Sequence, residues 1–148
     1  MSLRPIKTED AGLIIQMLLA LHVESSHYNK VQPDPSYVRT TLTAMIEQPC
    51  FIGHIDVDLR GFMFGIANRT WFDSELNAYE LLLYILPEYR GSFLAPRHIK
   101  QCEIDASRLG CVHVRAGTST LVNTEKTLRL YERLGYTREG LTVSKRIN

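Results

Sequence analysis

The residues whose types and spacing could support chemistry lie in two segments of the 148-residue chain. The first, residues 83–99, reads LYILPEYRGSFLAPRHI: an apolar run, a proline-bearing turn and the start of a helix. The first turn of a helix carries unpaired N–H groups and the positive end of the helix dipole, so this junction is a typical phosphate or pyrophosphate site. Gly91 also has a purely conformational explanation, because glycine is common in such turns. This segment alone therefore does not predict a ligand.

The second segment, residues 130–136, reads LYERLGY. Together with LPEYRG at residues 86–91, it resembles the GNAT superfamily of acyl-CoA-dependent N-acetyltransferases. In that family an apolar-Pro-Glu-Tyr-Arg-Gly strand end leads into the R/Q-x-x-G-x-G/A loop that holds the CoA pyrophosphate. A later helix ends in Leu-Tyr-Glu-x-Leu-Gly-Phe/Tyr. The resemblance covers the whole chain by the order of its elements, and these two segments by motif.

The resemblance implies how the chain would hold acetyl-CoA. Leu83, Tyr84 and Ile85 would lie on a splayed strand whose backbone pairs with the pantetheine arm and polarises the thioester carbonyl. Arg90 takes the first position of the pyrophosphate loop. The backbone N–H groups offered to the phosphates would come from Gly91, Ser92, Phe93, Leu94 and Ala95.

The chain departs from the family pattern at three positions. Phe93 replaces the central glycine of the loop and cannot allow the same close backbone approach. Pro96 follows the loop and has no N–H group to offer. A variant loop path or weaker CoA binding is expected. The asparagine that often stands seven positions before the family tyrosine is Thr124 here, with Asn123 one residue earlier, and either could reach the cofactor.

Acid and base catalysis would fall to two residues. Tyr131 matches the family tyrosine that hydrogen-bonds the CoA sulfur and protonates the departing thiolate. The amine must lose a proton, and Glu80 is the first candidate base, because burial in the apolar run 78–86 would raise its pKa. An ion pair with a neighbouring arginine, or a position facing water, explains Glu80 equally well. Asp73 and Glu75 in the preceding loop are reserves.

The acceptor pocket is expected beside the loop between the first two helices, which commonly contributes to it in this family. Tyr28 in that loop and Trp71 at the end of a later strand are the principal candidates for its walls. The accompanying polar and aromatic residues are His22, Glu24, His27 and Phe72. Ordinary surface packing explains each of them as well. Nearby acidic residues would suit a cationic amine, while polyamine, amino acid, antibiotic and protein amines all stay open.

Hydrophobic periodicity and helix signals predict the elements that position these residues. Strands are expected at residues 3–7, 51–57, 62–70, 78–86, 111–116 and 136–147, and helices from Thr8, from Asp34–Pro35 to Pro49, at 95–109 and at 124–134. This order, β α α β β β α β α β, predicts one α/β (α+β) domain over residues 1–148. Its mixed, mostly antiparallel sheet would have about six to seven strands and be covered by four helices.

Composition excludes several classes of partner. The formal net charge of +1 gives no electrostatic footprint for nucleic acid or an anionic membrane. No apolar run approaches the roughly 18 residues that a membrane span needs. Cys50, Cys102 and Cys111 have neither metal-ligand spacing nor an even number for a disulfide framework. We therefore expect a cytoplasmic protein without a metal site.

The sequence as a whole predicts an N-acetyltransferase that moves an acetyl group from acetyl-CoA to a primary amine by direct attack in a ternary complex. The alternative is a degenerate GNAT-fold module that binds acyl-CoA or a protein without catalysis, which Phe93 favours and the intact tyrosine segment disfavours. An unrelated α/β domain with a similar turn is disfavoured by the two motifs in family order. A homodimer is compatible with the apolar residues near the C-terminus.

Overall fold

Five strands pair into one sheet in the order β1-β2-β3-β4-β5 in the computed structural model, which describes residues 2–72, 74–140 and 142–148. The strands are β1 (Leu3–Pro5), β2 (Phe51–Asp56), β3 (Gly61–Arg69), β4 (Leu76–Ile85) and β5 (His113–Arg115). Neighbouring strands are antiparallel except for the parallel pair β4 and β5. The predicted mixed, mostly antiparallel sheet is confirmed.

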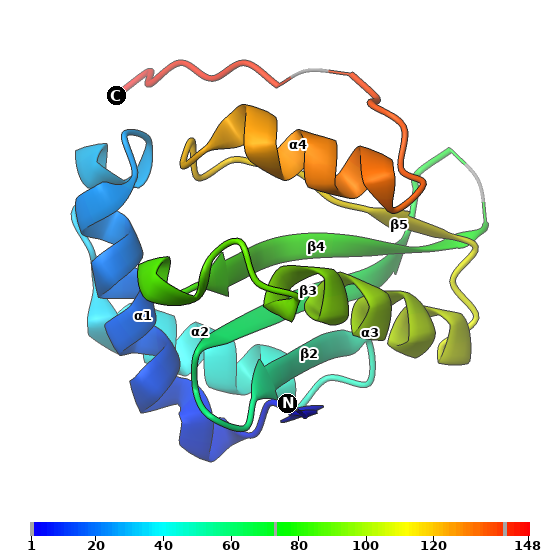
Figure 1. Cartoon of the computed structure of the whole chain (residues 1–148), viewed down its shortest axis with the longest axis horizontal. Coiled ribbons are helices and arrows are strands. Elements are labelled where there is room, and N and C mark those ends of the chain that lie inside the picture. The colour runs from blue at the N-terminus through cyan, green and yellow to red at the C-terminus, as the bar shows by residue number, and fades with distance from the viewer. Residues whose placement is uncertain (1, 73, 141) are drawn as a thin grey trace.

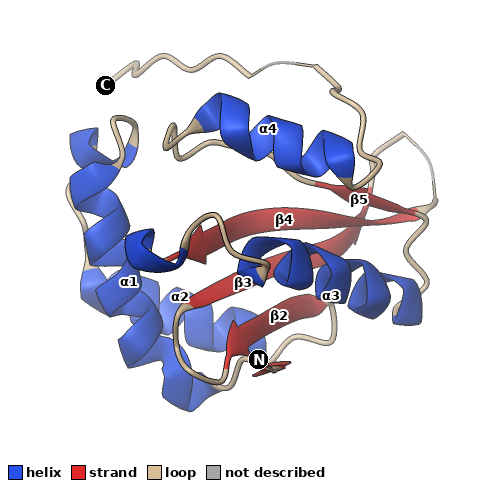
Figure 2. Cartoon of the chain, in the orientation of Figure 1, coloured by secondary structure: helices blue, strands red, loops and turns tan. Residues whose placement is uncertain are grey.

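Within the described residues, four helices cover the two faces of this sheet (Figure 1, Figure 2). They are α1 (Ala11–Glu24), α2 (Pro35–Ile46), α3 (Leu94–Arg108) and α4 (Thr124–Arg133), with 3-10 turns η1 (Thr8–Asp10), η2 (Tyr28–Lys30) and η3 (Pro87–Tyr89). In the described parts of the chain, no helix is long and apolar enough to cross a bilayer.

Local signals explain where the helices begin. Asp34 Oδ1 accepts a hydrogen bond from the Tyr37 N–H at 3.0 Å, and Pro35 occupies the first turn, so α2 begins as predicted. The first helix differs from the prediction, because Thr8 starts a 3-10 turn rather than α1. The Asp10 carboxylate accepts from the Lys7 N–H at 2.8 Å and from both terminal nitrogens of Arg4, and this anchor delays α1 to Ala11.

The predicted strand at residues 136–147 is wrong, and the described sheet has five strands rather than six to seven. Residues 136–140 and 142–148 form no strand. Arg138 pairs with Glu132 at 2.6 Å and with Glu125 at 2.8 Å, which holds the chain along α4 instead of along β5. Gly140 then adopts φ +59°, which breaks an extended backbone. Figure 1 shows the C-terminal segment passing along α4.

Two hydrophobic clusters lie on opposite faces of the sheet. The α1/α2 core consists of Ile6, Ala11, Ile14, Met17, Leu21, Leu42, Ile55, Phe62, Phe64, Leu82 and Tyr84. The α3/α4 core consists of Ile52, Met63, Ala67, Ala78, Ile99, Cys102, Ala106 and Tyr131. Strand β4 contributes to both cores, so it is buried on both faces as its apolar sequence predicts.

A buried histidine pair between β2 and α3 should make the protein sensitive to acid. The rings of His54 and His98 stack at 4.9 Å, and burial lowers the pKa of His98 to about 3. The unfolded chain binds protons from about pH 6.5 downward while the folded state resists them, so stability falls as the pH drops. We expect about 2–3 kcal/mol less stability at pH 4.5 than at pH 7 from this residue. Urea unfolding of wild type and His98→Leu at both pH values measures it; equal losses in the two proteins would contradict it.

Candidate functional site

The site lies where β4 and β5 separate. Strand β5 pairs with Asn77, Ala78 and Tyr79 of β4, and residues 80–85 of β4 have no strand partner on that side within the described ranges. Figure 1 shows β5 running beside one part of β4 only. This opening provides the unpaired strand edge on which the sequence analysis places Leu83, Tyr84 and Ile85. An extended ligand with amide groups could pair with it as a strand would.

A β-bulge in β4 shapes this opening. Phe64 pairs with Leu82 and Gly65 with Glu80, so Leu81 has no opposite residue in β3. The extra residue shifts the alternation of side chains between the two faces of the sheet, so that residues before and after Leu81 at even spacing point to opposite faces. Ala78 therefore packs in the α3/α4 core, and Leu82 packs in the α1/α2 core.

Gly65 is the residue in β3 that permits the bulge. A Cβ atom there would lie 3.0 Å from the carbonyl carbon of Tyr79, 3.1 Å from Cα of Glu80 and closer still to the carbonyl oxygen of Tyr79. The bulge is not among the features predicted from the sequence. Its signal was a glycine inside an otherwise apolar strand, which often marks a bulge or a close backbone approach.

Glu80 bridges the two strands at the point where they diverge. The Gly117 N–H, just beyond β5, donates to Oε2 of Glu80 at 3.0 Å. Burial raises the pKa of Glu80 to about 7, although the N–H groups of Gly117 and Leu83 oppose that rise. None of the described arginines or lysines forms a salt bridge with Glu80. The side chain is a half-buried carboxylate that can both hold and release a proton near neutral pH.

The raised pKa of Glu80 should lower the stability of the fold above neutral pH. The carboxyl group ionises near pH 4.5 in the unfolded chain but near pH 7 in the folded one, so stability falls between these values. We expect Glu80→Gln to match wild type near pH 4 and to exceed it by up to about 3 kcal/mol at pH 8. Chemical denaturation of both proteins across this range measures the difference. A constant difference at every pH would show that Glu80 titrates normally.

Tyr131 projects from α4 into the core beside the opening. The side chain is 5% exposed, and its hydroxyl is buried with no hydrogen-bond partner among the described residues. Burial raises its pKa, and the negative charge of Glu80 adds to the rise, so the phenol keeps its proton at neutral pH. The ring of Tyr136 packs edge-on against it at 5.1 Å. A buried hydroxyl without a partner is costly unless a ligand atom satisfies it, and a thioester sulfur at this position would.

The loop before α3 presents free N–H groups. Those of Gly91, Ser92, Phe93 and Ala95 meet no acceptor in the described part of the chain. The Leu94 N–H is already bonded to Ser92 Oγ at 3.3 Å, and this hydroxyl donates to the Tyr89 carbonyl at 2.7 Å. Four of the five predicted N–H groups are therefore available to an anion, with the helix dipole behind them.

Phe93 fits this loop without backbone strain. Its φ and ψ are −74° and 4°, which any residue adopts, and the positive φ of the loop falls instead on Gly91, at +78°. Pro96 lies in the first turn of α3, where a missing N–H costs nothing. The replacement of glycine by Phe93 therefore leaves the backbone free to form the loop. The phenylalanine side chain is 78% exposed.

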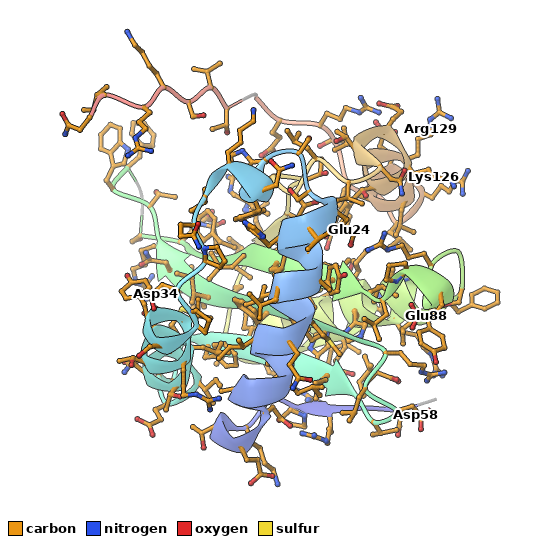
Figure 3. The ribbon with its side chains drawn as sticks, turned by 90° about the vertical axis from the view of Figure 1, so that its left-hand side faces the viewer. Glu24, Asp34, Asp58, Glu88, Lys126 and Arg129 are labelled. Carbon is orange, nitrogen blue, oxygen red and sulfur yellow. The ribbon has the colours of Figure 1, made fainter. Side chains whose placement is uncertain are left out.

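Arg90 is occupied by contacts within the protein. Its guanidinium forms two hydrogen bonds with the Glu24 carboxylate, at 2.5 and 2.8 Å, and Nε donates to the Ile85 carbonyl at 2.9 Å. These hydrogen bonds, with the charge of Arg90 adding to them, lower the pKa of Glu24. Arg90 thus ties the end of β4 to the end of α1, where Figure 3 shows Glu24. Because 66 positions separate the two residues, sequence reasoning missed their pairing.

The residues proposed for the acceptor pocket do not meet. Tyr28, in η2, packs against the α1/α2 core near the end of α1. Trp71 is 95% exposed and follows the Arg69 end of β3, the opposite end of the sheet from the Gly61–Ile85 pair.

Of the other candidates, His22 and Glu24 lie in the last turns of α1 rather than in a loop. His27 and Phe72 pack edge-on against their neighbours Tyr28 and Trp71, and Glu75 is exposed just before β4. Asp73 lies outside the described residues.

Ser25 connects the segment of Tyr28 to the opening, a role that sequence reasoning missed. The side chain is fully buried, accepts from the Tyr28 N–H at 3.0 Å, and donates to the Thr120 carbonyl in the loop between β5 and α4. Asn123 and Thr124 end this loop. Asn123 is exposed with φ +49° and Thr124 is half-buried at the start of α4, so the structure does not choose between them.

The described residues of the site supply acid–base groups on Glu80 and Tyr131 and anion-binding N–H groups in the loop before α3. Within residues 2–72, 74–140 and 142–148, no group of three or more His, Cys, Asp or Glu side chains is placed to hold a metal ion. Burial raises the pKa of Cys102, next to Tyr131 in the α3/α4 core, to about 12, so this thiol is not a nucleophile at neutral pH.

Solved structures share this fold over their full length. An aminoglycoside acetyltransferase from an uncultured soil metagenomic sample is 18% identical, with 100% of each chain covered and a TM-score of 0.73. An acetyltransferase of Trypanosoma brucei is 16% identical, with 99% of each chain covered and a TM-score of 0.72. The ribosomal-protein-alanine N-acetyltransferase of Brucella melitensis biovar Abortus 2308 is 14% identical, with 99% of this chain and 100% of that chain covered and a TM-score of 0.70.

Searched against curated proteins, the chain has no match. The model of the acetyltransferase (GNAT) family matches residues 17–136, a span that contains the second half of α1, the strands from β2 to β5, and α4 with Tyr131. The chain belongs to the acetyltransferase (GNAT) family.

Proposed function

We propose that this protein is an N-acetyltransferase that moves an acetyl group from acetyl-CoA to a primary amine in a ternary complex. The observation that carries the proposal is the buried, unpartnered hydroxyl of Tyr131 next to the open edge of β4. Glu80 lies on β4 two residues after Ala78, which packs with Tyr131 in the α3/α4 core, and its charge adds to the rise in the pKa of Tyr131. A buried acid and a carboxylate of near-neutral pKa suit a proton-coupled acyl transfer.

The residues present fit the binding of a CoA thioester. The N–H groups of Gly91, Ser92, Phe93 and Ala95 would hold its phosphates, and the unpaired edge of β4 would hold its pantetheine arm. Acetyl-CoA supplies the activated acetyl group and leaves as the free thiol.

The proposed chemistry uses the protein for proton transfer and orientation. Glu80 takes a proton from the ammonium form of the acceptor, directly or through one water, so that the nitrogen lone pair can bond to the thioester carbonyl carbon. As the carbon–sulfur bond breaks, Tyr131 gives its phenol proton to the sulfur. Solvent exchange then returns a proton to Tyr131 and removes one from Glu80, so the charge balances. The products are an acetamide and a thiol.

The acceptor is proposed to be a cationic amine. Glu88 follows the end of β4 (Figure 3), and its exposed carboxylate would attract an ammonium group, whereas the Glu24 carboxylate is paired with Arg90. The similar structures include enzymes named for aminoglycosides and for the alanine of a ribosomal protein, which are both amine acceptors. Polyamines, amino acids, aminoglycosides and protein amines therefore form the panel to test.

The test is thiol release from acetyl-CoA in the presence of that panel, followed by mass spectrometry of the amine. We expect at least one amine to gain an acetyl group at a rate that rises with enzyme concentration. Binding of acetyl-CoA without transfer to any amine would favour the second candidate, a binding module without catalysis. Two observations favour that candidate: Phe93 stands where the family pattern has a glycine, and Arg90 forms an ion pair with Glu24.

A further inference from the structure

Phe93 places an unusual side chain at the entrance of the proposed cofactor site. It is the N-cap residue of α3, and 78% of the residue is exposed, whereas the next residue, Leu94, is 1% exposed. The Phe93 ring contacts no other aromatic ring and no cation in the described parts of the chain. The backbone does not require phenylalanine here, because its φ and ψ are ordinary.

The position of this ring relative to the free N–H groups suggests its use. The Phe93 N–H and those of Gly91, Ser92 and Ala95 can all receive a phosphate. Because these N–H groups belong to Phe93 itself and to residues one or two positions away in the chain, a phosphate bound by them would lie close to the Phe93 ring. The nucleoside attached to that phosphate is then within reach of an exposed aromatic face, on which nucleobases stack whatever their sequence context.

A protein-docking patch explains Phe93 less well. Such patches are contiguous apolar areas of several hundred Å². The neighbouring aromatic residue, Tyr89, is 40% exposed and has the Arg60 guanidinium over its ring at 5.7 Å. The flanking Gly91 and Ser92 are exposed and not apolar, so the Phe93 ring is not part of a contiguous apolar patch with them.

We infer that Phe93 stacks on the adenine ring of the acyl-CoA donor and thereby selects a nucleotide-bearing thioester over shorter acyl thioesters. The inference rests on the proposed function and deepens it. The Phe93 ring would add a contact to the adenine base. The family pattern has a glycine at this position, which only lets the backbone approach the phosphates. The loop would then recognise two chemically different parts of one donor.

The experiment compares two donors, acetyl-CoA and S-acetyl-4′-phosphopantetheine, which has the same thioester arm and its first phosphate but no adenosine. Dissociation constants for both are measured by calorimetry with wild type, Phe93→Ala, Phe93→Tyr and Tyr37→Ala. The control Tyr37→Ala removes a 67% exposed aromatic ring from α2. We expect Phe93→Ala to weaken the binding of acetyl-CoA about tenfold or more and to leave that of S-acetyl-4′-phosphopantetheine unchanged. Phe93→Tyr and Tyr37→Ala should bind both donors as wild type does.

Any other pattern of dissociation constants contradicts the stacking role of Phe93. Equal weakening of both donors by Phe93→Ala would mean that the ring supports the loop rather than the base. No weakening of either donor would mean that the ring does not contact the ligand. If wild type binds neither donor, the proposed function fails together with the inference. If wild type binds acetyl-CoA and Phe93→Ala binds it equally well, only the stacking role of Phe93 fails. Thermal unfolding of each variant confirms that the fold is retained.

Discussion

Replacing Tyr131 by phenylalanine is expected to lower kcat by about 10² to 10³-fold while leaving the affinity for acetyl-CoA nearly unchanged. The substitution removes a proton donor and keeps the ring that packs with Tyr136 and the α3/α4 core. Because the Tyr131 hydroxyl is buried without a partner, its loss should not destabilise the free protein. Steady-state kinetics, CoA titration and thermal unfolding together measure the three expectations.

Tyr136→Phe is the matched control for this experiment. The Tyr136 hydroxyl is also buried without a partner, and its ring contacts Tyr131 at 5.1 Å, but it lies beyond the end of α4. We expect Tyr136→Phe to keep kcat within a few-fold of wild type. If Tyr131→Phe turned over as fast as wild type, another group would have to protonate the thiolate, and Tyr131 would be a core residue only.

Replacing Gly65 by alanine is expected to destabilise the fold by about 4 kcal/mol and to abolish acetyl-CoA binding. The added Cβ would meet the Tyr79 carbonyl group and Cα of Glu80, which are backbone atoms and cannot rotate away. Relieving the clash requires β4 to move away from β3 or to lose its bulge, and either change displaces Glu80 and the open edge. Urea unfolding and CoA titration measure the two effects.

Gly117→Ala provides the control for stability, because a Cβ on Gly117 would meet no atom within 4 Å. This variant should unfold within about 1 kcal/mol of wild type. A Gly65→Ala protein as stable as Gly117→Ala, with unchanged CoA affinity, would show that the bulge is not needed for the site.

The fold could be predicted wherever a local signal decided the structure. Asp34 and Pro35 give the start of α2, and the switch in hydrophobic period at Cys50 gives the following strands. The strand predicted at 136–147 failed because a tertiary contact, the pairing of Arg138 with α4, overrides a weak alternation of apolar residues. A short segment with charges and glycine has too little apolar area to choose a sheet edge by itself.

The motif residues of the site could be predicted from the sequence, but the contacts between residues far apart in the chain could not. Tyr131 and the loop at Gly91–Ala95 follow from the family resemblance, and the structure adds the burial of one and the free N–H groups of the other. The bulge depends on the register of two strands, which a single sequence does not fix. Trp71 and Tyr28 do not share a pocket, because Trp71 follows the Arg69 end of β3, whereas Tyr28 lies near the end of α1, which Glu24 and Arg90 tie to the opposite end of the sheet.

The most direct test of the account is the free energy of unfolding with and without acetyl-CoA. If the opening between β4 and β5 binds acetyl-CoA, a concentration 100 times the dissociation constant should add about 2.7 kcal/mol to the stability of wild type. The gain should disappear in Gly65→Ala, which closes or distorts the opening, and persist in Tyr131→Phe. No gain at any acetyl-CoA concentration up to the millimolar range would contradict a CoA site in this opening.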